Sequence, residues 1–268
     1  LDQPPLAALL SAASQRGLGS TDGAAALPGL PLTFLAGVGT GMLAALLAGP
    51  WAAVLSGILL GAHPHLLAYA ATGGVVEALA AALGAWLLYG LASGLSPVLM
   101  GFLASLLFLT RTDGLFAVPV LLLLMAARGG LGGRKGLLGF GLGWLLPTFP
   151  WLARNFSVTG NPLFSMQTLN LAMYSEAFPS YSLHSSLIPK ASLGWLLSFA
   201  REHPLDMASK SLAGLATLAW HIPASWGPFL GGALLLAVMS PGPVRRTGIE
   251  SGLLLGLPAL GWVVSNSY

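Results

Sequence analysis

The feature that most constrains this chain is how little charge it carries. Its 268 residues include eleven Lys and Arg and eight Asp and Glu, so 7% of the sequence is charged and 55% is hydrophobic. A soluble domain carries roughly 25% charged residues. Because so few charges cannot build a water-facing surface, most apolar side chains must face lipid. We therefore expect an integral membrane protein.

The apolar runs are continuous rather than alternating, which indicates membrane-crossing helices and not a β-barrel. A helix needs about 20 apolar residues to cross the hydrocarbon core. Runs near this length are Leu27–Leu47, Trp51–Ala71, Val75–Leu91 and Gly136–Ala153. Shorter runs are Pro97–Thr110, Leu115–Ala127, Phe229–Met239 and Gly252–Val264. The predicted fold class is all-α: a polytopic transmembrane helical bundle with juxtamembrane helices and one larger extracytoplasmic loop.

Composition divides the chain into three regions. The run Leu6–Gly17 is too short and too polar to cross a bilayer, so it predicts a helix in the membrane interface. Charged residues and prolines return after Arg154, where Ala191–Glu202 and Leu205–Trp220 are expected to form amphipathic surface helices. The regions are a transmembrane core with its N-terminal juxtamembrane helix (1–153), an extracytoplasmic loop (154–224) and C-terminal transmembrane helices (225–268).

Basic residues in short loops predict the orientation, since they favour the cytoplasmic side. Two such loops contain Arg128, Arg134 and Lys135, and Arg245 and Arg246. Alternation then places the 111–114 break, the loop after Arg154 and the N-terminal segment on the outer face of a cell membrane, plasma or inner. Five basic residues count against this rule: Arg111, Arg154, Lys190, Arg201 and Lys210. Some of these outer cations are therefore expected to have a function.

Ionisable groups at membrane depth are costly and often functional. Arg111 and Asp113 lie in LTRTDGL. They either neutralise each other in a helix-breaking turn, or Arg111 binds a phosphate, which suits its planar fork of donors. Glu77, near the start of a span, either interacts with the helix dipole or lines the outer cavity as an acid. Arg154 either anchors the helix beside Trp151 or contacts substrate.

Residues for several other chemistries are missing or badly spaced. The chain has no cysteine, which excludes a disulfide framework and a thiolate metal site. His63 and His65 are poor metal ligands at their spacing. The net charge of +3 is too small and too dispersed to indicate nucleic acid. No metal ligands, cofactor or nucleic-acid partner are predicted, and metal dependence stays open.

Three segments, in order, resemble one family of membrane enzymes. Asp2-Gln3-Pro4-Pro5-Leu6 is similar to an acidic-or-His, x, Pro-Pro-Leu motif. The stretch 109–115, LTRTDGL, followed by Pro119, resembles an LT(K/R)xxGLxxxP break. The stretch 150–155, PWLARN, with TGNPLFS at 159–165, resembles a PWLxRNxxxTGNPLFS segment. The family is the GT-C glycosyltransferases of family 39, the protein mannosyltransferase and aminoarabinose transferase type. The resemblance covers residues 2 to about 165.

The resemblance implies an activity and a set of roles. Such enzymes move a sugar, with inversion, from a polyprenyl-phosphate carrier to a protein, lipid or glycan acceptor outside the cytoplasm. Arg111 would contact the lipid phosphate. Asp113, Arg154 and Asp2 would be further substrate-binding residues, and Glu77 would be the second acidic residue of the site. The family's main catalytic aspartate would precede Leu1. We therefore expect the chain to be a fragment that is inactive alone.

Two other functions stay open at this stage. A transporter or lipid flippase would place binding groups near the midplane on broken helices, often in two matching halves. The chain has no internal repeat, and its charges gather at one face, which favours an enzyme. A non-catalytic scaffold or degenerate homologue is the third reading. The lipid bilayer is the partner common to all three.

Overall fold

The computed structural model describes residues 4–61, 68, 74–164, 193–210, 212–213 and 216. Regular structure within these residues is all helical. In chain order the elements are α1 (Pro5–Leu18), α2 (Asp22–Ala26), α3 (Gly29–Ala48), α4 (Pro50–Gly61), α6 (Val75–Ser93), α7 (Pro97–Thr110), the 3-10 helix η1 (Thr112–Phe116), α8 (Ala117–Ala127), α9 (Arg134–Thr159) and α12 (Leu193–Glu202).

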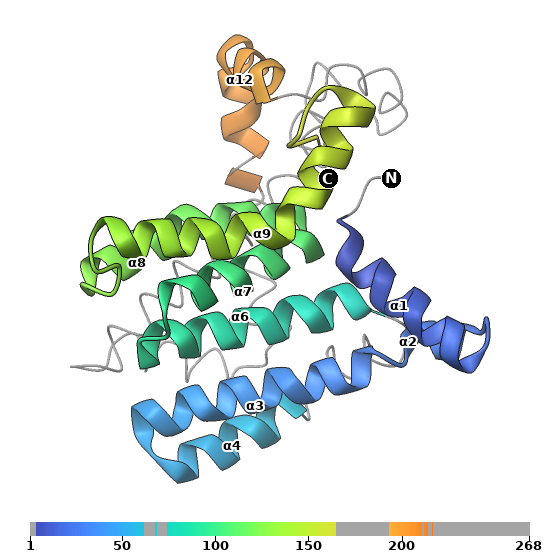
Figure 1. Ribbon diagram of the computed structural model, residues 1–268, viewed down its shortest axis with the longest axis vertical. Coiled ribbons are helices and arrows are strands. Elements are labelled where there is room, and N and C mark those ends of the chain that lie inside the picture. Colours follow the sequence, from blue (N-terminus) through green and yellow to red (C-terminus); the bar gives the residue numbers. More distant parts are fainter. Residues whose placement is uncertain are drawn as a thin grey trace.

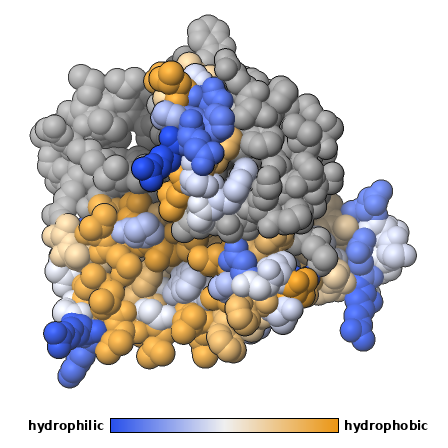
Figure 2. Space-filling model, turned by 90° about the horizontal axis from the view of Figure 1, so that it is seen from above, coloured by the Kyte–Doolittle hydropathy of each residue, from blue (hydrophilic) through white to orange (hydrophobic). Residues whose placement is uncertain are grey.

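Among the described residues, three helices are long and apolar enough to cross a membrane: 22–48, which contains α2 and α3, then α6, then α9. α7 and the stretch 114–127 are apolar but shorter. The bounds of α3 and α6 agree within two residues with the apolar runs expected at 27–47 and 75–91, and α7 has the same bounds as the run expected at 97–110. Figure 2 shows the corresponding surface, a broad hydrophobic area with hydrophilic patches toward its edges.

The long helices pack side by side in the order α4, α3, α6, α7 and α9 (Figure 1). Ser96 starts α7: its hydroxyl oxygen accepts a hydrogen bond from the Leu99 amide at 3.4 Å, and Pro97 follows at the first helical position. Across α3 and α6, the Trp86 indole donates to the Leu35 carbonyl at 3.2 Å. The buried core is shared by α6, α7, α8 and α9 and includes Leu87, Met100, Leu121 and Phe140.

α7 and α9 cross with their backbones in close approach. A Cβ added at Gly101 would collide with the Phe140 carbonyl, and one added at Gly143 would collide with the Val98 carbonyl. Small residues allow such contacts between membrane helices, where dispersion forces and not water exclusion drive association. This crossing fixes the register of the two helices that carry Arg111 and Arg154.

The helix ends differ from the expectations in two places. α9 continues to Thr159, so the first six residues of the region expected as a loop, 154–159, are helical. The short helix α2 was not predicted, although its signal is present: the Thr21 hydroxyl accepts from the Ala24 amide at 3.1 Å, and Asp22 occupies the first turn. α1 and α12 confirm helices where Leu6–Gly17 and Ala191–Glu202 were expected.

Several predicted features lie outside the described residues. They are Asp2, most of the second half of the run Trp51–Ala71, the loop residues 165–192, and residues 217–268 with the two last apolar runs and Arg245 and Arg246. Residues 204–210, within the expected helix Leu205–Trp220, are helical.

Candidate functional site

One end of the bundle collects Glu77, Arg111 and Arg154, and we call it the Arg111 end. α6 starts there and α7 returns to it, because only the short turn 94–96 joins these packed helices. Arg111 lies thirteen residues beyond Val98, and Arg154 lies eleven beyond Gly143. Arg111 is therefore roughly 20 Å past the α7/α9 crossing. α9 runs toward the same end, but it changes direction near Pro147 and Pro150 before it reaches Arg154 (Figure 1). α1 packs against α6 and α7 beside this end (Figure 1).

Arg111 ends α7 with an extended backbone, φ −146° and ψ 131°. Its amide still donates to the Leu107 carbonyl at 2.9 Å, and its own carbonyl accepts from the Gly114 amide at 2.9 Å. Gly114 is buried, and a Cβ there would meet the backbone of Leu107 and Phe108 at 2.9 Å. The break expected at 111–114 is thus a tight turn folded back on α7, with the half-buried Arg111 at its corner.

The acidic candidates are placed less completely. Glu77 is half-buried in the first turn of α6, where its carboxylate opposes the positive end of the helix dipole. That position agrees with either role proposed for Glu77. Asp113 belongs to η1, but its side chain lies outside the described set, as does all of Asp2.

Arg154 is held by two neighbours on α9. Its guanidinium carbon lies 4.9 Å from the centre of the Trp151 ring, a cation–π contact. Its Nη1 donates to the Asn155 Oδ1 at 3.3 Å. The Arg154–Trp151 contact that the anchor interpretation requires is therefore present. Because a guanidinium carries five N–H donors, these contacts orient Arg154 without using its full capacity for an anion.

Asn155 ties the end of α9 to the loop that follows. Its side chain is 3% exposed, and its amide nitrogen donates to the carbonyls of Pro162, at 3.4 Å, and Phe164, at 3.3 Å. The Thr159 hydroxyl donates to the Asn155 carbonyl at 2.8 Å, and the Asn161 side chain accepts from the Leu163 amide at 3.1 Å. The RN…TGNPLF pattern therefore folds as one self-bonded corner, a role that sequence reasoning did not assign to Asn155.

Two further features were not predicted. The indole N–H groups of Trp144 and Trp151 are buried and lack an acceptor within the described part of the chain. Lys210, in the helical stretch 204–210, is 7% exposed, and its burial lowers the pKa from 10.5 to about 8. The sequence of an apolar run does not show which tryptophan N–H will be buried without a hydrogen-bond acceptor. The residues around Lys210 likewise do not distinguish it from an exposed lysine.

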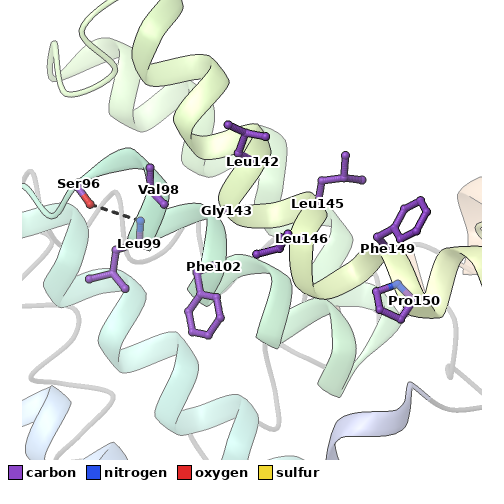
Figure 3. Close-up of a pocket in the computed structure, with 10 residues that line it drawn as sticks. All are labelled: Ser96, Val98, Leu99, Phe102, Leu142, Gly143, Leu145, Leu146, Phe149 and Pro150. Atoms are coloured by element: carbon purple, nitrogen blue, oxygen red, sulfur yellow. Dashed lines mark hydrogen bonds between the residues drawn. The ribbon is translucent and has the colours of Figure 1, made fainter.

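An open groove of about 540 Å³ runs between α7 and α9 (Figure 3). Its lining residues are Ser96, Val98, Leu99, Phe102, Leu142, Gly143, Leu145, Leu146, Phe149 and Pro150. We call it the α7/α9 groove. The lining has no charged side chain, and Ser96 is its only side-chain hydroxyl. The spacing Gly139-x-x-x-Gly143 could have indicated a close helix contact, but not the groove beside it.

Within the described residues, no three His, Cys, Asp or Glu side chains gather as a metal site would require. Compared with protein-family models, curated proteins and solved structures, the chain matches none.

Proposed function

We propose that this chain belongs to a polytopic, multi-pass membrane glycosyltransferase. It would transfer a sugar from a polyprenyl-phosphate donor to an extracytoplasmic acceptor. The observation that supports the proposal is the topology: α6 begins with Glu77 and α7 ends at Arg111 at one end of an apolar bundle, toward which α9 carries Arg154. The ordered motifs at 109–115 and 150–165, which resemble family 39, support the same activity.

The sidedness follows from the basic residues at the other end. Arg128, Arg134 and Lys135 lie where α8 ends and α9 begins, and basic residues in short loops favour the cytoplasmic side. The Arg111 end is then extracytoplasmic, where the acceptor is found.

The reaction needs a base and a stabilised leaving group. The acceptor hydroxyl oxygen attacks the anomeric carbon of the sugar, and its proton passes to a carboxylate. The bond between that carbon and the phosphate oxygen breaks, and the polyprenyl phosphate leaves with the electron pair. Arg111 and Arg154 provide fixed positive charge where negative charge develops, which is worth more in a site that excludes water. Glu77 is the candidate carboxylate at this end.

The test is sugar transfer by the purified full-length protein, not by this chain alone, with a polyprenyl-phosphate sugar, comparing wild type, Arg111→Ala and Arg134→Ala. Removing one such stabilising donor costs about 100-fold or more in rate, so Arg111→Ala should lose activity at unchanged folding. Arg134→Ala, exposed at the opposite end, should keep it. Equal activity of both variants would remove Arg111 from the site, and no transfer by wild type would overturn the proposal in favour of a transporter or scaffold.

A further inference from the structure

The α7/α9 groove has the form of a site for an extended apolar chain. Figure 3 shows Leu99 and Phe102 of α7 on one wall and Leu142, Leu145 and Phe149 of α9 along the other. The volume of about 540 Å³ lies within the range of roughly 300–1,000 Å³ common for ligand sites. Apart from Ser96, whose hydroxyl oxygen accepts from the Leu99 amide, the lining has no polar side chain, so it favours an occupant that is apolar along the length of the groove.

The groove opens on the surface that a membrane would cover. Its wall residues Val98, Leu146 and Phe149 are 52%, 81% and 62% exposed. α9 is one of the helices long and apolar enough to cross a membrane. A lipid chain could therefore enter sideways from the bilayer without passing through water.

The two ends of the groove differ in charge. Arg154 follows Pro150 by four residues, which places it one turn beyond the groove on the same side of α9. The stacking on Trp151 and the hydrogen bond to Asn155 hold this cation in place. At the opposite end the lining finishes at the uncharged Ser96. The exposed Arg134 and Lys135 begin α9 at that end, but they lie at least seven residues before Leu142, the first lining residue of this helix, so Arg154 is the cation nearest the groove along α9. An amphiphile with an anionic head and an apolar tail therefore fits best with its head at the Arg111 end.

We propose that the α7/α9 groove holds the polyprenyl tail of the lipid-phosphate donor, with the phosphate at Arg154. This inference rests on the proposed function, because it takes the donor lipid from it. It adds the path of the tail: from Arg154 past Pro150 and Phe149, between Leu146 and Phe102, toward Val98. The phosphate then lies at the end of the bundle where Glu77 and Arg111 are also found.

The experiment uses the purified protein in lipid nanodiscs and a polyprenyl phosphate that carries a photoreactive diazirine in its tail. After irradiation, mass spectrometry maps the labelled residues. Leu146→Trp adds bulk to the groove wall. Leu138→Trp is the matched control, because Leu138 is also on α9 and is 67% exposed but does not line the groove.

We expect the label on α7 and α9 at groove residues, and about tenfold weaker labelling of Leu146→Trp than of Leu138→Trp. Arg154→Gln should weaken labelling by the phosphate lipid while leaving a diazirine polyprenol, which lacks the phosphate, unaffected. Label outside the groove, equal labelling of both Trp variants, or equal competition by an ordinary diacyl phospholipid would overturn the assignment. Groove labelling without sugar transfer would instead count against the proposed function and leave the lipid site standing.

Discussion

The two ends of the bundle use arginine in different ways. At the Arg128 end, formed by the turn 94–96 and the loop 128–133, the Arg128 Nη1 donates to the Leu91 carbonyl at 2.6 Å. It thus neutralises the carbonyls at the end of α6, a favourable position for a cation. At the Arg111 end, Arg154 is oriented by an aromatic face and a neighbouring amide, and most of its donors are not used in those two contacts.

This difference separates two reasons for keeping a costly cation near a membrane. An arginine that bonds a carbonyl at the end of a helix stabilises the fold directly. An arginine that is held mainly by stacking its guanidinium face on an aromatic ring keeps N–H donors for an anion. Counting basic residues per loop predicts sidedness, but it cannot distinguish these two uses. Substitutions at each end can.

The largest loss of stability should follow Asn155→Leu at the Arg111 end. The carbonyls of Pro162 and Phe164 would lose their shared donor, at about 0.5–1.5 kcal/mol for each hydrogen bond, and the charged Arg154 would lose its Oδ1 acceptor, at about 1.5 kcal/mol or more. We expect unfolding in detergent to show a drop of about 2–4 kcal/mol. Ser157→Ala, at an exposed hydroxyl on the same turn, should stay within about 0.5 kcal/mol of wild type. Similar losses in both variants would mean that the corner is not held by Asn155.

The next largest effect is expected at the other end. Arg128→Met removes a charged hydrogen bond to the end of α6 and should cost about 1.5–3 kcal/mol of unfolding free energy. Sugar transfer per folded molecule should not change, because the site lies at the opposite end. Lys135→Met is the control at an exposed cation nearby. A loss of transfer in Arg128→Met at full stability would break the division between the two ends.

Lys210 is a buried cation outside the candidate membrane spans, and it can be compared with the arginines at the two ends of the bundle through the pH dependence of stability. Its pKa is lower in the folded state, about 8, than its ordinary value of 10.5. Between these values the unfolded chain binds more protons, so stability should rise with pH from about 8 to 10.5 and should not respond to this group below that range. Lys210→Met should remove the rise, while Lys135→Met should keep it. A rise that survives in Lys210→Met would come from another group.

The smallest effect on stability is expected for Glu77→Gln. Losing the charge in the first turn of α6 costs about 0.3–1 kcal/mol. If Glu77 is the base, transfer should nevertheless fall by about 100-fold or more. Asp22→Asn is a matched control in the first turn of α2, where only the dipole effect is expected. Equal and small effects of both substitutions on transfer would leave Glu77 a helix-capping acid.

Much of the helical layout could be predicted, because it follows from long apolar runs and their punctuation. Pro97–Thr110 and the break at Arg111 were found in this way. Contacts between helices could not be predicted, since one sequence does not reveal which faces meet. The Arg128 bond to Leu91, the groove and the corner around Asn155 all depend on such contacts or on loop geometry.

The end of α9 illustrates the same limit on a local scale. Pro150 and Trp151 suggested that the helix stops near Ala153. Prolines often end helices, since they remove a hydrogen bond and clash with the preceding turn. Here α9 passes through both Pro147 and Pro150, and its last turn is bonded to the following loop by Asn155, which donates to the Pro162 carbonyl, and by Thr159, which donates to the Asn161 carbonyl. Tertiary bonding of the helix end outweighs the local preference.

The backbone contact at Gly101 and Gly143 has a consequence for how this chain can change. Because the backbones of α7 and α9 touch there, the contact is a fixed reference point on both helices. How far Arg111 and Arg154 lie from it is set by the number of residues between, and not by the side chains of those residues. Substitutions between Gly143 and Arg154 that spare Pro147 and Pro150 leave that count intact. A single inserted residue would raise Arg154 by about 1.5 Å and turn it by about 100°, away from its partners. Length, more than composition, is therefore the quantity that this part of α9 must preserve.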